Sequence, residues 1–178
     1  GENAVIPFTE GDGDYTVVGY QQIQGDQYAA LYSETLTVEL ENEFLPFLYP
    51  NQYVNFSPDS EASKRALSMV SEDALKQIYN YVVNNLSYDY DKAETVETGY
   101  LPDVDETLST KTGICFDYAA LTTAMLRSCD IPCKLQIGYT GDIKHAWIDV
   151  YIRSKGWVNN AVSFKGDSWS LMDPTFDS

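Results

Sequence analysis

The stretch of sequence that decides the fold is residues 113–128, GICFDYAALTTAMLRS. Its apolar side chains cover most of the circumference of a helix, and a helix that is apolar nearly all round is a buried one. Proline cannot continue a helix, so the segment Asp130-Ile131-Pro132 ends it. We therefore predict a buried helix from about Cys115 to Ser128, against which the rest of a domain packs.

After this helix the apolar residues recur every second position, which is typical of strands. In the central strand, one face takes Ala146, Ile148, Val150 and Ile152, and the other takes His145, Trp147, Asp149 and Tyr151. Leu135, Ile137 and Tyr139 alternate in the strand before it, with a turn at 141–142. Two more strands are predicted near 156–158 and 169–173, joined by a turn at 165–167. Helices followed by an antiparallel meander indicate an α+β domain with the helix packed on one face of the sheet.

The sequence before the buried helix is less regular. A helix is predicted over 71–86 with Ser71 as its N-cap, because apolar residues recur there on one helix face. Residues 87–112 have no periodicity and predict a long surface loop, with a short helix near Lys92 as an alternative. Residues 15–24 and 28–40 are rich in β-formers, and 44–56 predict an irregular connection. We therefore divide the chain into an N-terminal extension, 1–60, with β-rich segments that pack on the core, and a core domain, 61–178.

The charge of the chain excludes several classes of partner. Its 178 residues include 11 Lys and Arg against 27 Asp and Glu, a net charge of −16. A nucleic-acid binder needs clustered cations, and so does a surface that binds anionic lipid. No apolar run approaches the ~20 residues of a membrane span, and no secretory signal pattern opens the chain. With 14 tyrosines and few cations, the composition indicates an extracellular or cell-envelope protein of a bacterium.

Three residues form a constellation that suits covalent catalysis. Cys115 begins the buried helix, where the helix dipole favours a thiolate, the reactive form of cysteine. His145 is the one histidine of the chain and the natural base. A carboxylate must orient its imidazole, and we prefer Asp173 over Asp149, which lies about 13 Å further along the strand of His145. Each residue also has a structural interpretation: a buried thiol, a packed histidine and a turn.

Several segments of the sequence, in order, resemble one known family. They are Gly113-Ile-Cys-Phe-Asp-Tyr-Ala119, Met125-Leu-Arg127, Asp130-Ile-Pro132, Ile137-Gly-Tyr139, His145-Ala-Trp-Ile-Asp-Val-Tyr151 and Asp173-Pro-Thr175. Together they make residues 65–177 similar to the bacterial transglutaminase-like superfamily. The resemblance implies a papain-like core with Cys115 as nucleophile, His145 as base and Asp173 as orienting carboxylate. The chain departs from the family at Asp130, where glycine is common, and in its longer segment between His145 and Asp173.

The implied activity is acyl transfer on amide bonds of a protein or peptide, with cell-wall and surface proteins among the candidate substrates. The Cys115 backbone N–H is one expected oxyanion donor, and Tyr88 or Tyr100 is the candidate for the second. Of the three tryptophans, Trp147, Trp157 and Trp169, strand parity assigns only Trp147 to the face of His145, either as a wall of the site or as a packed aromatic. One wall favours an open cleft, so hydrolysis is expected ahead of amine cross-linking. The alternative is a catalytically idle binding module on the same fold.

No cofactor or metal is expected. Acids concentrate between Asp89 and Glu106, and we interpret them as a solvated face, with a calcium site as the alternative. Cys129 and Cys133 offer a disulfide across the helix end only if their Cα atoms lie within about 7 Å. A metal site on the same pair is less favoured, since Cys115 and His145 are committed to the catalytic constellation and no other soft ligand remains. The oligomeric state does not follow from the sequence.

Overall fold

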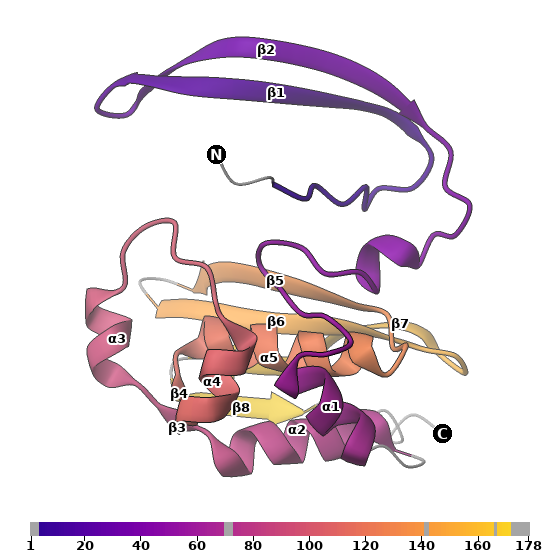
Figure 1. The fold of residues 1–178 in the computed structure, drawn as a ribbon, viewed down its shortest axis with the longest axis vertical. Coiled ribbons are helices and arrows are strands. Elements are labelled where there is room, and N and C mark those ends of the chain that lie inside the picture. The colour runs from indigo at the N-terminus through magenta and orange to yellow at the C-terminus, as the bar shows by residue number, and fades with distance from the viewer. Residues whose placement is uncertain (1–3, 70–72, 141–142, 166, 172–178) are drawn as a thin grey trace. The chain divides into compact units, whose positions relative to one another are not determined.

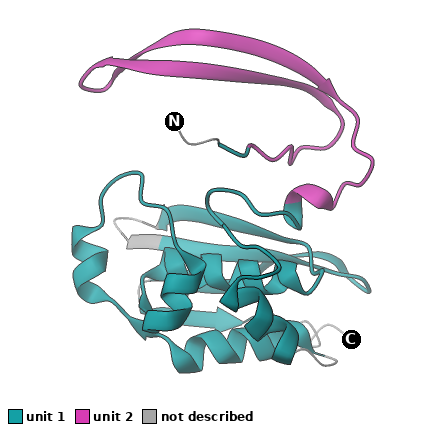
Figure 2. Cartoon of the chain, viewed as in Figure 1, with its two compact units in different colours: residues 1–5, 47–178 teal, residues 6–46 magenta. Residues whose placement is uncertain are grey.

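The computed structural model describes residues 4–69, 73–140, 143–165 and 167–171. Contacts divide the chain into two compact units (Figure 2), one of Gly1–Val5 with Phe47–Ser178 and the other of Ile6–Pro46. Residues 47–60, which the sequence assigned to the N-terminal extension, therefore belong to the larger unit. Within the described residues, no helix is long and apolar enough to cross a membrane.

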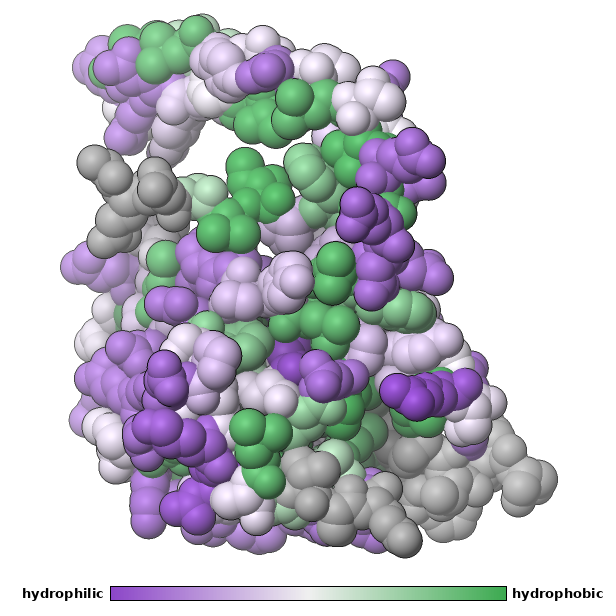
Figure 3. All heavy atoms as spheres, turned by 45° about the vertical axis from the view of Figure 1, so that its right-hand side comes forward, coloured by the Kyte–Doolittle hydropathy of each residue, from purple (hydrophilic) through white to green (hydrophobic). Residues whose placement is uncertain are grey.

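The smaller unit is a hairpin of two antiparallel strands, β1 (Gly13–Gln24) and β2 (Gln27–Val38). Strands were predicted in both segments, and their pairing is interrupted by a bulge after Gly19. Large apolar side chains remain on its surface (Figure 3), including Ile23 and Leu31, which are 66% and 70% exposed. A two-stranded ribbon has no second layer of its own to cover such side chains.

The larger unit contains a four-stranded antiparallel sheet in the order β5-β6-β7-β8 (Figure 1). Its strands are β5 (Cys133–Thr140), β6 (Ile143–Ile152), β7 (Gly156–Lys165) and β8 (Ser168–Leu171). The predicted meander is confirmed, but β7 is much longer than expected. A bulge in β7 opposite Asp149 lets the pairing with β6 continue over this length. The Asp149 carboxylate accepts hydrogen bonds there from the Asn160 backbone N–H (2.8 Å) and from the Gln136 side-chain amide.

The helices are α1 (Glu61–Met69), α2 (Ala74–Asn85), α3 (Tyr90–Thr95), α4 (Val104–Thr110) and α5 (Cys115–Ser128), with a short 3-10 turn at Leu45–Phe47. The bounds predicted for α5 are confirmed. The predicted N-cap of α2, Ser71, lies outside the described residues, and Asp73 caps this helix by accepting from the Lys76 N–H. No pattern predicted α1.

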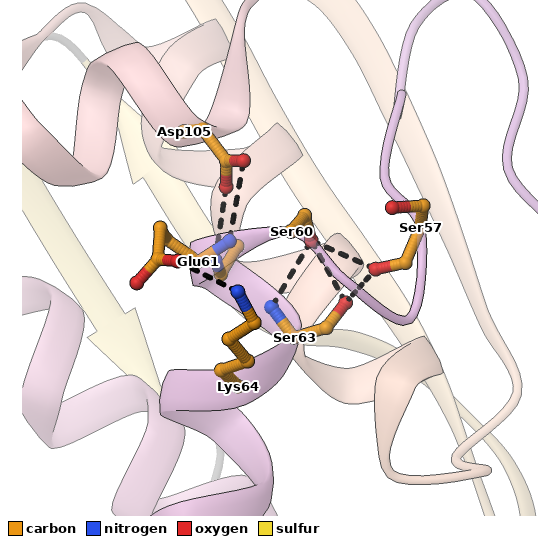
Figure 4. Close-up of polar contacts among 7 residues, drawn as sticks. Ser57, Ser60, Glu61, Ser63, Lys64 and Asp105 are labelled. Atoms are coloured by element: carbon orange, nitrogen blue, oxygen red, sulfur yellow. Dashed lines mark hydrogen bonds and ion pairs between the residues drawn. The ribbon is translucent and has the colours of Figure 1, made fainter.

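The prediction of a long loop over 87–112 is wrong. This segment holds α3, which is the alternative helix near Lys92, then α4 and the short parallel strands β3 (Ser87–Tyr88) and β4 (Thr112–Gly113). Its acids cap helices: Asp89 accepts from the Lys92 N–H, and Asp103 accepts from the Asp105 and Glu106 N–H groups. Asp105 in turn accepts from the first N–H groups of α1 (Figure 4), at 3.2 and 2.9 Å.

Because Asp89, Asp103 and Asp105 already accept from N–H groups at helix N-termini, these carboxylates are less available as calcium ligands. Across residues 4–69, 73–140, 143–165 and 167–171, no three His, Cys, Asp or Glu side chains gather in a way that could hold a metal ion.

Helix α5 is the centre of the larger unit. It is buried from Cys115 to Arg127, packs on β5, β6 and β7, and is flanked by α1, α2 and α4 (Figure 1). Cys129 and Cys133, which lie just beyond this helix, do not form a disulfide. The Cys133 thiol instead points at the Thr123 carbonyl (3.7 Å).

The Arg127 side chain holds the C-terminal end of α5 against neighbouring segments. Its guanidinium donates to the Tyr49 carbonyl (2.7 Å) and the Cys133 carbonyl (2.8 Å) and is almost fully buried. We expect Arg127→Met to lower the free energy of unfolding by roughly 2–4 kcal/mol, because two carbonyls lose a donor inside the protein. Urea denaturation followed by circular dichroism measures it. Arg153→Met, at an exposed position, is the matched control, and an equal effect of both would contradict this role.

Candidate active site

Cys115 is the first residue of α5, and its thiol lies where the sequence placed it, at the N-terminus of a buried helix. The side chain is 2% exposed. The backbone N–H groups of a first turn and the helix dipole both favour negative charge. The position therefore suits a thiolate nucleophile.

Tyr88 lies beside this helix start. In the parallel pair of β3 and β4, Tyr88 is the register partner of Gly113, and the Asp89 N–H donates to the Gly113 carbonyl (3.0 Å). Burial raises the pKa of Tyr88, and the nearby Cys115 and Asp167 raise it further. The Tyr88 phenol is therefore neutral at physiological pH and close to the thiol, as a second oxyanion donor must be.

Tyr100, the other candidate donor, is engaged elsewhere. Its hydroxyl donates to Asp117 Oδ1 (2.5 Å) and accepts from Lys92 Nζ (2.7 Å). Burial and the hydrogen bond to Asp117 raise the pKa of Tyr100 to about 12. Since its proton is held by a buried carboxylate, Tyr100 does not fit the role of oxyanion donor.

His145 is partly exposed on β6, with Trp147 and Ser163 on the same face of the sheet. Its Nε2 shares a hydrogen bond with the Ser163 hydroxyl (2.5 Å), and its ring centre is 5.3 Å from that of Trp147. Trp147 covers Gly138, where a Cβ would lie 3.1 Å from the indole ring. The sequence did not point to Ser163. Its place beside His145 follows from the pairing of β6 with β7, in which Ser163 is the partner of Trp147.

A stack of aromatic rings relates the helix start to the end of the sheet that carries His145. Tyr118, one turn after Cys115, lies 5.6 Å from both Phe164 and Trp169, and it is parallel to Trp169 within 20°. Phe164 is the strand partner of Ala146, the neighbour of His145. These rings therefore join the first turns of α5 to β6 at Ala146, while His145 lies on the opposite face of that strand.

The sequence also did not point to the Tyr118 hydroxyl as a polar group of this region. It is buried and has no hydrogen-bond partner within the described part of the chain. Buried polar groups are nearly always satisfied, so a water or a substrate group would be stabilised there.

The two candidate carboxylates differ. The Asp149 oxygens accept hydrogen bonds from Asn160 and Gln136, as described above, so this carboxylate stabilises the sheet. Asp173 lies outside the described residues. The strand that precedes it, β8, pairs with β7.

A separate cavity of about 740 Å³ lies between the segment 50–60 and the residues that begin α4. Its wall includes Pro50, Phe56 and Leu101 as apolar residues and Asp103 and Asp105 as charged ones. Both carboxylates already cap helices, and Cys115 and His145 are not among the residues that line the cavity. This cavity therefore offers volume without a reactive group.

Comparison with known proteins decides the family. The model of the transglutaminase-like superfamily matches residues 61–174, nearly two thirds of the chain. The chain belongs to the transglutaminase-like superfamily. The α+β fold agrees with the papain-like core of this family.

Three further similarities are more limited. UPF0252 protein MJ1282 of Methanocaldococcus jannaschii is 40% identical over 62 residues, which are 32% of this chain and 18% of that protein. A structure from Cytophaga hutchinsonii, provisionally assigned as a cysteine protease, is similar over 97% of this chain and 80% of its own, with a TM-score of 0.50 and 15% identity. The periplasmic domain of TgpA from Pseudomonas aeruginosa is similar over 61% of this chain and 47% of its own, with a TM-score of 0.45 and 18% identity. At 15% identity, the likeness to the Cytophaga structure describes the fold alone.

The relative reactivity of the three thiols tests whether the start of α5 favours a thiolate at Cys115. Burial raises the pKa of Cys133 to about 11, and burial together with Asp130 raises that of Cys129. We expect iodoacetamide at pH 6 to label Cys115 at least tenfold faster than Cys129, although Cys129 is the more exposed. Peptide mass spectrometry measures the rates. If exposure alone governed reactivity, Cys129 would be labelled first.

Proposed function

We propose that this protein is a cysteine-dependent enzyme that transfers acyl groups from amide bonds of a protein or peptide. Cys115 is the nucleophile, His145 the base and Asp173 the carboxylate that orients the imidazole. The observation that carries the proposal is the position of Cys115, the first residue of a helix buried along almost its whole length. The superfamily match is consistent with this assignment.

The proposed reaction begins with transfer of the thiol proton to His145, since a thiolate is the attacking species. The proposal assigns one ring nitrogen of His145 to the thiol and the other to Asp173, so the hydrogen bond between Nε2 and the Ser163 hydroxyl gives way in the active arrangement. Attack on the amide carbonyl forms a tetrahedral oxyanion, which the Cys115 N–H and the Tyr88 hydroxyl stabilise. The imidazolium then protonates the leaving amine, and the acyl group remains on sulfur.

Water is the proposed acceptor of the acyl group, which makes the enzyme a peptidase or amide hydrolase rather than a cross-linking enzyme. Amine transfer requires that water be excluded while an amine enters. Of the three tryptophans, only Trp147 lies against His145: Trp169 stacks on Tyr118, and Trp157 packs with Phe47 and Tyr151. A partly exposed imidazole with one aromatic neighbour supports an open, water-accessible site.

The net charge of −16 further suggests a basic substrate, because an anionic surface raises the local concentration of cationic segments. We propose an extracellular or cell-envelope location on the tyrosine-rich, cation-poor composition.

A second candidate is a binding module on this fold that has no turnover. The low exposure of Cys115, 2%, and the hydrogen bond that holds His145 to Ser163 favour it. The two candidates differ in whether removal of one sulfur atom abolishes a reaction.

The product of the reaction tests the proposal. Wild-type protein and Cys115→Ala are incubated with a library of Lys- and Gln-containing peptides, with and without millimolar amine tracer. We expect cleavage or deamidation that falls by at least about 10³-fold in Cys115→Ala, because the nucleophile is lost. Mass spectrometry identifies the products, and Cys129→Ala is the matched control.

Two outcomes contradict parts of the proposal. Mainly amine incorporation that depends on Cys115 would reverse the order of hydrolysis and transfer. Tight peptide binding without any turnover would favour the binding module.

A further inference from the structure

An ion pair between the buried Asp117 and the partly exposed Lys92 lies under the first turn of α5. Asp117 is fully buried, and its Oδ2 is 2.8 Å from Lys92 Nζ and accepts from the Ile114 N–H at 2.8 Å. Its Oδ1 accepts from the Tyr100 hydroxyl. Lys92 Nζ also donates to that hydroxyl and lies 4.5 Å from the centre of the Tyr100 ring. Three segments of the chain therefore meet at one carboxylate.

The carboxylate fixes the turn that carries Cys115. By accepting from Ile114, it satisfies a backbone N–H at a helix start, the role of the acid in a capping box. Packing here is tight, because a Cβ on Gly113 would lie 2.7 Å from Asp117 Cβ. The position of the thiol therefore depends on the Asp117 side chain.

The same carboxylate presents an electrostatic problem for a thiolate. A negative charge two residues from Cys115, inside the protein, disfavours a second negative charge on sulfur. Lys92 neutralises it. Burial lowers the pKa of Lys92, but the hydrogen bonds to Asp117 and Tyr100 outweigh burial, and its pKa is raised overall. The ammonium thus stays charged at every pH at which the enzyme would act.

We propose that Lys92 is a positioning residue of the nucleophile: it neutralises Asp117, so that this carboxylate holds the first turn of α5 without suppressing the Cys115 thiolate. The proposal rests on the proposed function of Cys115. Other titratable groups around this turn are Tyr88, Tyr90 and the Asp167 that accepts a hydrogen bond from Tyr90. None of these changes in the variants below, so a difference between variants reports on Lys92 and Asp117.

The experiment measures the rate of iodoacetamide labelling of Cys115 between pH 5 and 9. In Lys92→Met, which keeps the length of the side chain, we expect the midpoint of the pH profile to rise by about one unit and the rate at pH 6 to fall about tenfold. Lys92→Arg keeps the charge and should stay within about threefold of wild type. Lys64→Met removes an exposed ion pair with Glu61 and should change nothing.

The double variant Lys92→Met/Asp117→Asn separates charge from packing. It leaves no unpaired buried charge, so it should fold even where Lys92→Met does not, and its midpoint should return toward wild type. A double variant as slow as the single one, or a Lys92→Met profile that matches wild type, overturns the proposal. If wild-type Cys115 is itself no faster than Cys129 at pH 6, the proposed function fails instead, which is a separate result.

Discussion

The structure depends on the burial of one helix from its first residue to nearly its last. A buried helix cannot leave its terminal backbone groups to water, so other parts of the chain must satisfy them. At the start of α5 this is done by Asp117, which accepts from the Ile114 N–H. Near its end the direction is reversed, because the Arg127 side chain of the helix satisfies the carbonyls of Tyr49 and Cys133 outside it. The segments around α5 are therefore held by hydrogen bonds at its two ends as well as by packing on its apolar surface.

The segment between α2 and α5 illustrates how this constraint organises an irregular sequence. Its carboxylates begin helices: Asp89 begins α3, Asp103 begins α4, and Asp105 closes the start of α1. The pairing of β3 with β4 then brings Tyr88 next to Gly113, two residues before the thiol. A stretch that is polar and acidic in sequence therefore forms one wall of the candidate site.

The environments of the three cysteines differ in more than their burial. Cys133 is enclosed by apolar neighbours, and its raised pKa keeps it protonated. Cys129 lies beyond the helix C-terminus, next to Asp130, where negative charge is disfavoured. Cys115 is as buried as many core residues, but it lies at the positive end of the helix dipole. Position along the helix, rather than exposure, distinguishes the candidate nucleophile.

The sequence by itself determined α5 with its bounds, the antiparallel order of the sheet and the hairpin strands, because period and turn residues are local signals that survive without tertiary context. The family followed from the resemblance of its motifs, in order along the chain. The sequence also selected Cys115 and His145, since the chain offers one helix start with a thiol and one histidine. Only the tertiary structure decided that Tyr88 lies beside Cys115, that Ser163 meets His145, and that Lys92 and Tyr100 meet at Asp117. These contacts join residues up to 27 positions apart, or lie across paired strands. No local propensity encodes them, because the free energy that fixes them comes from satisfying a buried carboxylate and buried rings, which exist only once the chain has packed.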